Sequence, residues 1–411
     1  MQRARLRTGD QTLVREINLA LILDNIRELG PISRAGLAEL TGLNKTTVSS
    51  IIQELIDGEF VHEVGLASSG IGRPAVLLEI NPNAGVIISA EIGVDFISTI
   101  RTNFSPEVLW EQQEPIRPEM GQRAIILRTL ALLHDAVESS GSSKGDIFGM
   151  AVGVPGLVDQ TTNVLLFAPN LGWRDVPLAR ILRDDFHGVP IFVDNEANLA
   201  ALGEYYFGVA QGCEDVLYIS AGVGLGGGIL RNGVIFRGKT GVAGEFGHMT
   251  MDPNGELCNC GNRGCWETQV SQRSVFHQIK SKINAGQESI LPVMLEGDLE
   301  GLNIPTVIEA ATEGDKVVLQ VLDGVGHDLG VGIASLVNAL NPDLVVFGGI
   351  LSLAADFLLP TAKIELEKRA LEWNRSATKI LPARYGFDAC IMGGVATVYQ
   401  KVLAYPGGAA W

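Results

Sequence analysis

The side chains that can do chemistry are concentrated in one stretch, GEFGHMTMDPNGELCNCGNRGCWE, at residues 244–267. It holds three of the chain's five cysteines and one of its six histidines, with the spacing H-x9-C-x-C-x4-C. Three thiolates and one imidazole suit tetrahedral Zn²⁺, and two glycines before the last cysteine let the chain fold back around an ion. No position is left for water, so the predicted zinc is structural. Its predicted ligands are His248, Cys258, Cys260 and Cys265.

Two alternatives use the same cysteines, and composition bears on both. One is a disulfide with a spare thiol, and the other is an iron–sulfur site. Five cysteines in 411 residues do not form the dense disulfide framework of small secreted domains. The N-terminus has no apolar core or cleavage signal, and no run of about eighteen apolar residues is present. We therefore expect a cytoplasmic protein without a membrane partner.

Length and charge indicate several domains with different roles. A chain of 411 residues with 46% hydrophobic residues predicts two or three globular domains. The net charge is −16, but the first 80 residues account for only −2 of it. Four arginines lie within the first fifteen residues. A basic arm on an acidic body leaves DNA binding possible at that end and opposes it elsewhere.

The first 60 residues predict a helix-turn-helix. Ser33 can cap a short helix that runs through Leu40, Gly42 permits a tight turn, and Asn44 can cap a helix that runs to about Asp57. An earlier helix ends at Gly30-Pro31. Its predicted apolar stripe consists of Leu19, Ile22, Ile26 and Leu29.

The helix after Asn44 has one apolar and one polar face, as recognition helices do. Val48, Ile51, Ile52 and Leu55 follow the i, i+3, i+4, i+7 pattern of a buried face. Short polar side chains on the other face suit base edges and phosphates. The predicted DNA contacts of this helix are Lys45, Thr46, Thr47, Ser50 and Gln53.

The segment FVHEVGLASSGIGRPAVLLEI, residues 60–80, predicts two strands joined by a loop. This is the pattern of a wing, whose tip would place Arg73 in a minor groove. The alternative is a three-helix packing module that makes no DNA contact. Asn81-Pro82-Asn83 marks the predicted domain boundary.

From residue 84 onward, predicted strands and helices alternate, which indicates an α/β fold with mixed sheets. VIISAEIGVDFISTIRTN and EDVLYISAGVGLGGGILRNGVIF each predict a hairpin. The glycine run in the second hairpin lacks the Lys-Ser/Thr of a P-loop and leads into a strand, so it is not a dinucleotide fingerprint. The glycines could form a turn whose backbone lets phosphate oxygens approach, or a turn with no binding role.

Four motifs together resemble the ROK family of repressors, open reading frames and sugar kinases. They are GVPGLVD, APNLGW, VDNEANLAALGE and GEFGH…CNCGNRGCWE, in the family's order. The resemblance covers nearly the whole chain and implies an actin-like (ribonuclease H-like), two-lobed sugar-kinase-type fold behind a winged helix-turn-helix. It also implies a sugar cleft between the lobes, with the zinc cluster shaping one wall.

The resemblance fixes the expected domains and sugar site. We expect a DNA-binding domain at 1–82, a small lobe at 83–194 completed by the C-terminal helix 391–411, and a large lobe with the zinc site at 195–390. Carboxylates and amides suit hydroxyl-rich ligands, and zinc ligation would hold the histidine ring in place. The implied sugar-binding residues are Gly156, Asn170, Asn195, Glu196, Glu245, His248 and Glu267.

Three departures from the family's kinases favour a regulator without enzymatic activity. The kinase phosphate loop D-x-G-G-T corresponds here to EIGVD, with acidic Asp95 where a threonine hydroxyl would meet phosphate. A second loop has Gly222-Val223-Gly224 in place of Gly-Thr-Gly. Glu196 occupies the general-base position, where its extra methylene would misplace the carboxylate.

The sequence therefore predicts a sugar-responsive repressor of carbohydrate-utilisation genes that is released from operator DNA by sugar. The VDNEANLAALGE segment is similar to the xylose-repressor subgroup, so xylose is the first expected effector, followed by glucose or a glucoside. A homodimer or homotetramer would place paired helices in successive major grooves. The alternatives are a sugar kinase with a fused DNA-binding domain and a repressor controlled by a protein partner.

Overall fold

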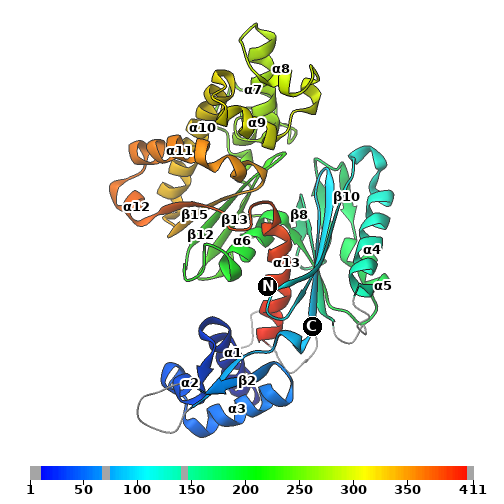
Figure 1. Cartoon of the computed structure of the whole chain (residues 1–411), viewed down its shortest axis with the longest axis vertical. Helices are drawn as coiled ribbons and strands as arrows, with labels where there is room; N and C mark the ends of the chain where they lie inside the picture. The colour runs from blue at the N-terminus through cyan, green and yellow to red at the C-terminus, as the bar shows by residue number, and fades with distance from the viewer. Residues whose placement is uncertain (1–10, 67–74, 140–146, 405–411) are drawn as a thin grey trace.

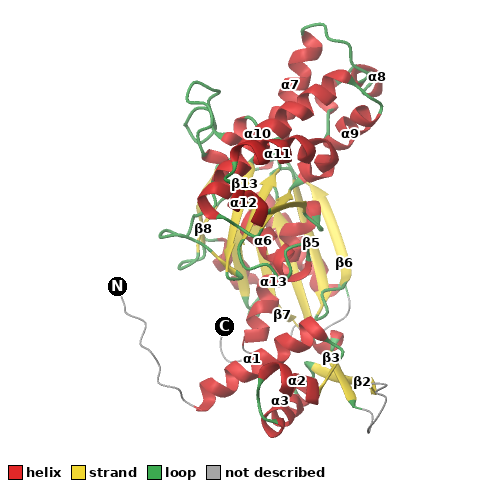
Figure 2. Cartoon of the chain, turned by 90° about the vertical axis from the view of Figure 1, so that its left-hand side faces the viewer, coloured by secondary structure: helices red, strands yellow, loops and turns green. Residues whose placement is uncertain are grey.

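The structure is a computed structural model that describes residues 11–66, 75–139 and 147–404. An N-terminal module, residues 11–80, lies at one end of an elongated molecule (Figure 1). Two five-stranded sheets occupy the middle, and helices cover the far end, as the side view also shows (Figure 2). The predicted α/β fold with mixed sheets is confirmed.

The N-terminal module has the predicted succession of helices, with the predicted caps. The Ser33 hydroxyl accepts the Gly36 N–H at 3.1 Å, and the Asn44 side chain accepts the Thr47 N–H at 2.8 Å. Gly42 turns the chain between the helices with φ = 69°, which favours glycine. The elements are α1 (Gln11–Leu29), α2 (Arg34–Thr41) and α3 (Lys45–Asp57), with β1 (Ile32–Ser33), β2 (Val61–Leu66) and β3 (Val76–Ile80) in the sheet order β1-β3-β2.

The prediction that Leu29 belongs to the buried stripe of α1 is wrong. Leu29 is 50% exposed, whereas Leu23, which was not predicted, is fully buried. The buried residues Leu19, Ile22, Leu23 and Ile26 follow the i, i+3, i+4, i+7 pattern of one helix face, which ends before the last helical residue. Besides the rest of the module, α1 contacts helix α13 (Ala389–Ala404).

The first five-stranded sheet has the order β11-β7-β4-β5-β6. The predicted hairpin forms as the antiparallel pair β4–β5, while β7 and β11 run parallel to β4. A smaller antiparallel sheet, β10-β9-β8, follows β7. The strands are β4 (Val86–Ile92), β5 (Phe96–Asn103), β6 (Val108–Pro115), β7 (Ile147–Val154), β8 (Leu157–Asp159), β9 (Val164–Ala168), β10 (Trp173–Val176) and β11 (Ile191–Asn195), with helices α4 (Gln122–Glu138) and α5 (Leu178–Asp185).

The second five-stranded sheet has the order β14-β13-β12-β15-β16. Its hairpin β12–β13 is also as predicted, and β15 pairs parallel to β12. The strands are β12 (Val216–Ala221), β13 (Leu225–Arg231), β14 (Val234–Ile235), β15 (Leu344–Gly348) and β16 (Lys379–Pro382). The helices around it are α7 (Gln272–Asn284), α8 (Leu291–Met294), α9 (Ile304–Thr312), α10 (Lys316–Leu340), α11 (Ala355–Arg369) and α12 (Glu372–Ala377).

Two helices link the sheets. Helix α6 (Glu196–Phe207) follows β11 of the first sheet and packs on β12 and β13 of the second. It also lies along α13, which packs against β4 and β7 (Figure 1). The domain limits drawn at residues 82/83, 194/195 and 390/391 remain a prediction.

Helix α10 is the one described helix that is long and apolar enough to span a membrane by length and composition. Of its most apolar window, 61% is buried inside the protein. Fully buried side chains such as Val325, Leu329 and Ile333 belong to the core beside the second sheet. The helix therefore has the burial of a core helix.

One hydrophobic core joins the N-terminal module to the first sheet and α13. Phe60 of the module packs on Phe104 and Phe148 with ring centroids 5.8 Å away in each case. Phe104 in turn lies 4.8 Å from the ring of Tyr399 on α13. The module is thus attached through packed aromatic side chains as well as through the chain itself.

Candidate functional site

The four predicted metal ligands lie together. The donor atoms of His248, Cys258, Cys260 and Cys265 are all within 4.8 Å of one another. Gly261 (φ = 92°) and Gly264 (φ = 61°) have left-handed backbone between the last two cysteines. A Cβ at Gly264 would lie 1.5 Å from the Asp252 carbonyl oxygen, so only glycine fits there.

The spacing of the donor atoms fits a tetrahedral ion. Cys260 Sγ lies 3.7 Å from Cys265 Sγ, and Cys258 Sγ lies 3.7 Å from His248 Nδ1. Zn–S bonds of about 2.3 Å place two sulfurs of a tetrahedral site about 3.8 Å apart. All five cysteines are free thiols, so the disulfide alternative is not formed here. Burial raises the pKa of the Cys258 and Cys265 thiols, which is the cost that a bound cation would offset.

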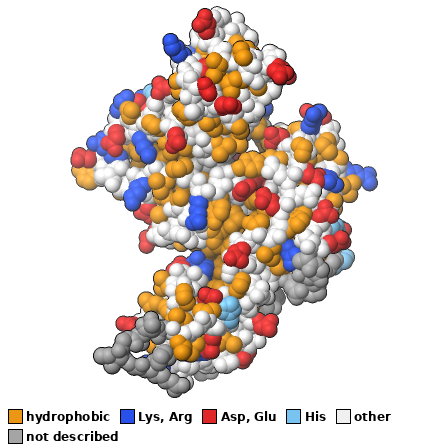
Figure 3. Space-filling model, viewed as in Figure 1, with side chains coloured by type: hydrophobic (Ala, Val, Ile, Leu, Met, Phe, Trp, Pro, Cys, Tyr) orange, Lys and Arg blue, Asp and Glu red, His pale blue; other side chains and the backbone are white. Residues whose placement is uncertain are grey.

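Next to this cluster, a cavity of about 830 Å³ opens between the two sheets. In the middle of the face shown in Figure 3, red carboxylates and orange hydrophobic side chains lie next to each other. The cavity is lined by β-strand ends and loops from both sheets and by the first residues of α6 and α13. All seven predicted sugar-binding residues line it: Gly156, Asn170, Asn195, Glu196, Glu245, His248 and Glu267.

Asn195 is fixed at the start of α6. Its side-chain oxygen caps the helix by accepting the N–H groups of Ala197 at 2.9 Å and Asn198 at 3.2 Å. Its amide nitrogen donates to the Gly156 carbonyl and to Glu196, both at 3.1 Å. Because the cap holds the amide in one orientation, Glu196 is held at the cavity wall.

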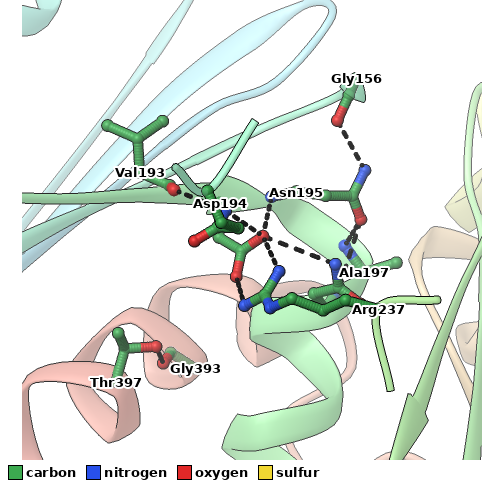
Figure 4. A network of polar contacts seen from close by, with 10 residues as sticks. Gly156, Val193, Asp194, Asn195, Ala197, Arg237, Gly393 and Thr397 are labelled. Atoms are coloured by element: carbon green, nitrogen blue, oxygen red, sulfur yellow. Dashed lines mark hydrogen bonds and ion pairs between the residues drawn. The ribbon is translucent and has the colours of Figure 1, made fainter. Parts of the chain in front are cut away.

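A buried ion pair lies directly behind Asn195 (Figure 4). Asp194 is 6% exposed and accepts two hydrogen bonds from the guanidinium of Arg237, one of them at 3.0 Å. It also accepts the Asn195 N–H at 2.8 Å and the Gln160 amide at 3.1 Å. The sequence analysis missed this pair, because its members are 43 residues apart and no local pattern connects them.

The metal cluster and the cavity share side chains. His248 directs Nδ1 toward Cys258 and Nε2 toward Glu245, whose carboxylate oxygen lies 3.8 Å away. Glu267 accepts the Leu225 N–H at 3.1 Å and the Cys258 thiol at 3.3 Å. The next residue upstream, Trp266, is fully buried and donates to the Asp328 carbonyl of α10 at 3.0 Å. The loop is thus held on both sides.

Acidic side chains are the most frequent ionisable residues in the cavity lining. Five of the lining residues are acidic, and none is lysine or arginine. Burial raises the pKa of Glu91 to about 8, and the charges of Asp388 and Asp95 add to the rise. Burial and the charges of Glu91 and Glu245 raise the pKa of Glu196 well above its usual range. The five carboxylic residues are Glu91, Asp95, Glu196, Glu245 and Glu267.

The residues predicted to contact DNA lie far from this cavity, on α3 at the end of the molecule (Figure 2). Thr47 is half-buried, and its N–H is taken by the cap at Asn44. Gln53 donates to Asp57 at 2.8 Å. The predicted contact Arg73 lies outside the described residues. The exposed members of the predicted set are Lys45, Thr46, Ser50 and Gln53.

Removing the partner of Asp194 should destabilise the protein. We expect Arg237→Ala to lower the free energy of unfolding by about 3 kcal/mol, because a buried carboxylate would lose its partner. Arg231→Ala is the matched control, since Arg231 is 62% exposed and lies 3.9 Å from Asp215. Its cost should stay within about 0.5 kcal/mol. Urea unfolding followed by circular dichroism measures both, and equal losses would contradict this account.

The cysteine cluster predicts metal loss on substitution. Cys260→Ser should purify with little bound metal, because a hydroxyl replaces one of the three thiolates. Cys213→Ser is the control, since Cys213 is half-buried and outside the cluster. Plasma emission spectrometry of the purified proteins gives the metal content. An unchanged content in Cys260→Ser would refute the site.

Glu91 predicts a pH dependence of stability. Burial raises the pKa of Glu91 in the folded state to about 8, above its value in the unfolded chain. At a pH between the two pKa values, the folded protein holds a proton on Glu91 that the unfolded chain has lost. Stability is therefore lost as the pH rises through this window. As the pH rises from about 5 to about 8, the free energy of unfolding of Glu91→Gln should increase relative to that of the wild type by up to about 1.4 kcal/mol per pH unit.

Thermal unfolding across that pH range tests the prediction. Glu300→Gln is the control, because the Glu300 side chain is 86% exposed. Its curve should run parallel to that of the wild type. A parallel curve for Glu91→Gln as well would mean that Glu91 does not hold the proton.

Comparison with known proteins agrees with this architecture. The sequence profile of the ROK family matches residues 87–401. The chain is 34% identical to the xylose repressor of Caldicellulosiruptor bescii, over 97% of this chain and 99% of that protein. It is 32% identical to the xylose repressor of Bacillus subtilis, over 96% of this chain and 98% of that protein.

Solved structures show the same likeness. A ROK family transcriptional regulator, a homologue of the Escherichia coli MLC protein, superposes with a TM-score of 0.80 at 29% identity, covering 95% of this chain and 97% of that chain. A ROK family glucokinase from Streptomyces griseus, in complex with glucose and AMPPNP, has a TM-score of 0.70 at 32% identity. It covers 77% of this chain and 100% of its own. The chain, with its actin-like fold, belongs to the ROK family.

Proposed function

We propose that the protein is a sugar-responsive transcriptional repressor. The observation that carries this proposal is a single helix, α13, which contributes Cys390 to the cavity wall and Tyr399 to the core of the N-terminal module. The matched xylose repressors and the MLC-like regulator extend over nearly the whole chain, module included. The glucokinase matches only 77% of it.

The proposed sugar site is the set of seven lining residues. Its fixed amide and carboxyl groups suit hydroxyl-rich ligands, which need acceptors and donors at set positions. Glu267 and Glu245 would accept sugar hydroxyls beside His248. Xylose is the first proposed effector, with glucose or a glucoside next.

Zinc is the proposed ion of the cysteine cluster. His248, Cys258, Cys260 and Cys265 would hold it, and the ion would supply a rigid, fully coordinated cross-link. In that arrangement His248 keeps its Nδ1 on the metal side and its Nε2 on the cavity side. The loop that carries Glu267 would then be fixed before any sugar arrives.

We further propose that the protein is not a kinase. The Gly93 N–H already donates to the Phe96 carbonyl at 2.9 Å, so this loop does not offer it to a phosphate. Val94 and Asp95 follow it in place of Gly-Thr, and Asp95 would repel an anion. Glu196, at the general-base position, has a raised pKa that favours its neutral form. A neutral carboxyl can bind a sugar hydroxyl but cannot take its proton.

Helix α13 gives sugar binding a route to the DNA-binding end. Closing the cavity on a sugar would act on Cys390 at the start of α13 and move this helix together with α6, on which it packs. Because the other end of α13 is packed in the core of the N-terminal module, the module would move with it. The sugar must bind one arrangement more tightly than the other, since equal affinity would shift nothing.

On the DNA side, α3 would serve as the recognition helix of a winged helix-turn-helix. The exposed residues Lys45, Thr46 and Ser50 would face operator DNA, with Arg73 on the wing. A homodimer or homotetramer in the cytoplasm would pair two such helices on one operator, one helical turn apart.

Fluorescence anisotropy on DNA from upstream of the protein's own gene tests the proposal. Xylose should lower the affinity of the wild type for this DNA. Lys45→Ala should weaken DNA binding and reduce the salt slope by about one, because one phosphate contact is lost. Calorimetry should show unchanged sugar binding in this variant. Lys316→Ala, exposed at the start of α10, is the matched control and should bind DNA as the wild type does.

Three results would contradict parts of the proposal. DNA binding that no sugar alters, while Lys45→Ala still weakens it, would favour control by a protein partner. Sugar-dependent ATP turnover at ordinary kinase rates would favour a kinase with a fused DNA-binding domain. Equal DNA affinity of Lys45→Ala and wild type would place the DNA contact elsewhere than α3.

A further inference from the structure

The cavity is larger than one sugar ring requires. Its volume is about 830 Å³. A hexose has about twelve non-hydrogen atoms, and even at the ~30 Å³ that a water occupies in the liquid these would fill about 360 Å³. More than half of the cavity thus remains beside a single bound ring.

The cavity continues past the sugar set to Glu91, Asp95 and Phe96, around the turn from β4 to β5. Glu196 is close enough to both Glu245 and Glu91 for their charges to act on it. Glu91 is in turn acted on by Asp95 and Asp388. Carboxyl groups therefore line the cavity both at the sugar set and at the loop before β5, where Asp95 lies. Asp388 belongs to the short helix η8 (Gly386–Asp388).

Two aromatic rings form the wall at this far end. Phe96 and Phe387 both line the cavity, with ring centroids 4.5 Å apart and planes at 48°. Both are only half-buried, so part of each ring faces the open space. Gln113 and Asp95 line the same end and supply polar groups. An apolar face with polar groups at its edge matches a sugar ring, which has C–H faces and hydroxyls around its rim.

Charge decides against a phosphorylated occupant at this end. Asp95 would face any phosphate here, and no lysine or arginine lines the cavity. The backbone offers no substitute, because the Phe96 ring covers Gly93 so closely that a Cβ there would lie 2.2 Å from it. The Gly93 N–H is also already bonded. An uncharged ligand avoids this repulsion.

We infer that the cavity binds an uncharged saccharide of at least two rings, with one ring on the sugar set and the second against Phe96 and Phe387. This inference rests on the proposed function, because it assumes that the first ring occupies the seven-residue set. It adds that the effector is unphosphorylated and that an oligosaccharide or glycoside binds more tightly than the corresponding free monosaccharide, such as xylose. The second ring supplies binding energy that a monosaccharide lacks.

Isothermal titration calorimetry of the whole protein tests this inference. The probes are xylose, xylobiose, glucose, cellobiose, maltose and glucose 6-phosphate. We expect at least one disaccharide to bind about tenfold more tightly than its own monosaccharide, which corresponds to about 1.4 kcal/mol. Glucose 6-phosphate should bind more weakly than glucose. Phe387→Ala should remove most of the disaccharide gain and leave monosaccharide affinity within about twofold.

Trp373→Ala is the matched control, because this aromatic side chain is 78% exposed and does not line the cavity. It should keep the full disaccharide gain. Phe96→Leu provides a second variant if Phe387→Ala fails to fold. The comparison of disaccharides with monosaccharides on the wild-type protein tests the inference without either variant.

The outcomes separate this inference from the proposed function. Monosaccharides that bind while no disaccharide binds more tightly would overturn the two-ring inference and leave the sugar-responsive repressor intact. Glucose 6-phosphate binding more tightly than glucose would overturn the requirement for an uncharged ligand. No binding of any saccharide would overturn both.

Discussion

The close contact between α6 and α13 is the constraint on which the rest of the structure depends. A Cβ at Gly393 would lie 1.7 Å from the Leu199 carbonyl oxygen, and one at Gly203 would lie 2.6 Å from the Ala389 carbonyl oxygen. The two helix backbones therefore approach each other to a distance that side chains would forbid. This contact positions the start of α6, with Glu196, and the start of α13, with Cys390, on the same cavity.

The cavity combines buried charge with firm support. Arg237 neutralises Asp194 behind the wall, whereas Glu91 and Glu196 have no basic partner and hold protons more tightly. Buried carboxyl groups without a basic partner usually lower the stability of the folded protein. Clusters of such groups are found mainly where they bind a ligand, so they indicate binding sites. The cysteine cluster supports the other wall at the loop that contains Glu267.

How much was predictable depends on the range of the interactions. The caps at Ser33 and Asn44 and both hairpins follow from residues near one another, and the structure forms them as predicted. The cysteine spacing is local as well. The exposure of Leu29, the Asp194–Arg237 pair and the contact of Phe96 with Phe387 were not predicted. The ion pair and the aromatic contact depend on distant segments meeting, which neither periodicity nor spacing encodes. The sugar set was predicted through family motifs, and its role remains a proposal.

The aromatic contacts of Phe60 with Phe104 and Phe148 bear on how such a chain can evolve. Recombination at the boundary near residue 82 would join a foreign module to Phe104, Phe148 and Tyr399 without a matching surface. The exchanged protein would expose apolar rings or pack them poorly, and it would lose stability. Sequence changes on the module's inner face and on α13 should therefore arise together. The N-terminal module and the C-terminal helix α13 should be exchanged between relatives only together.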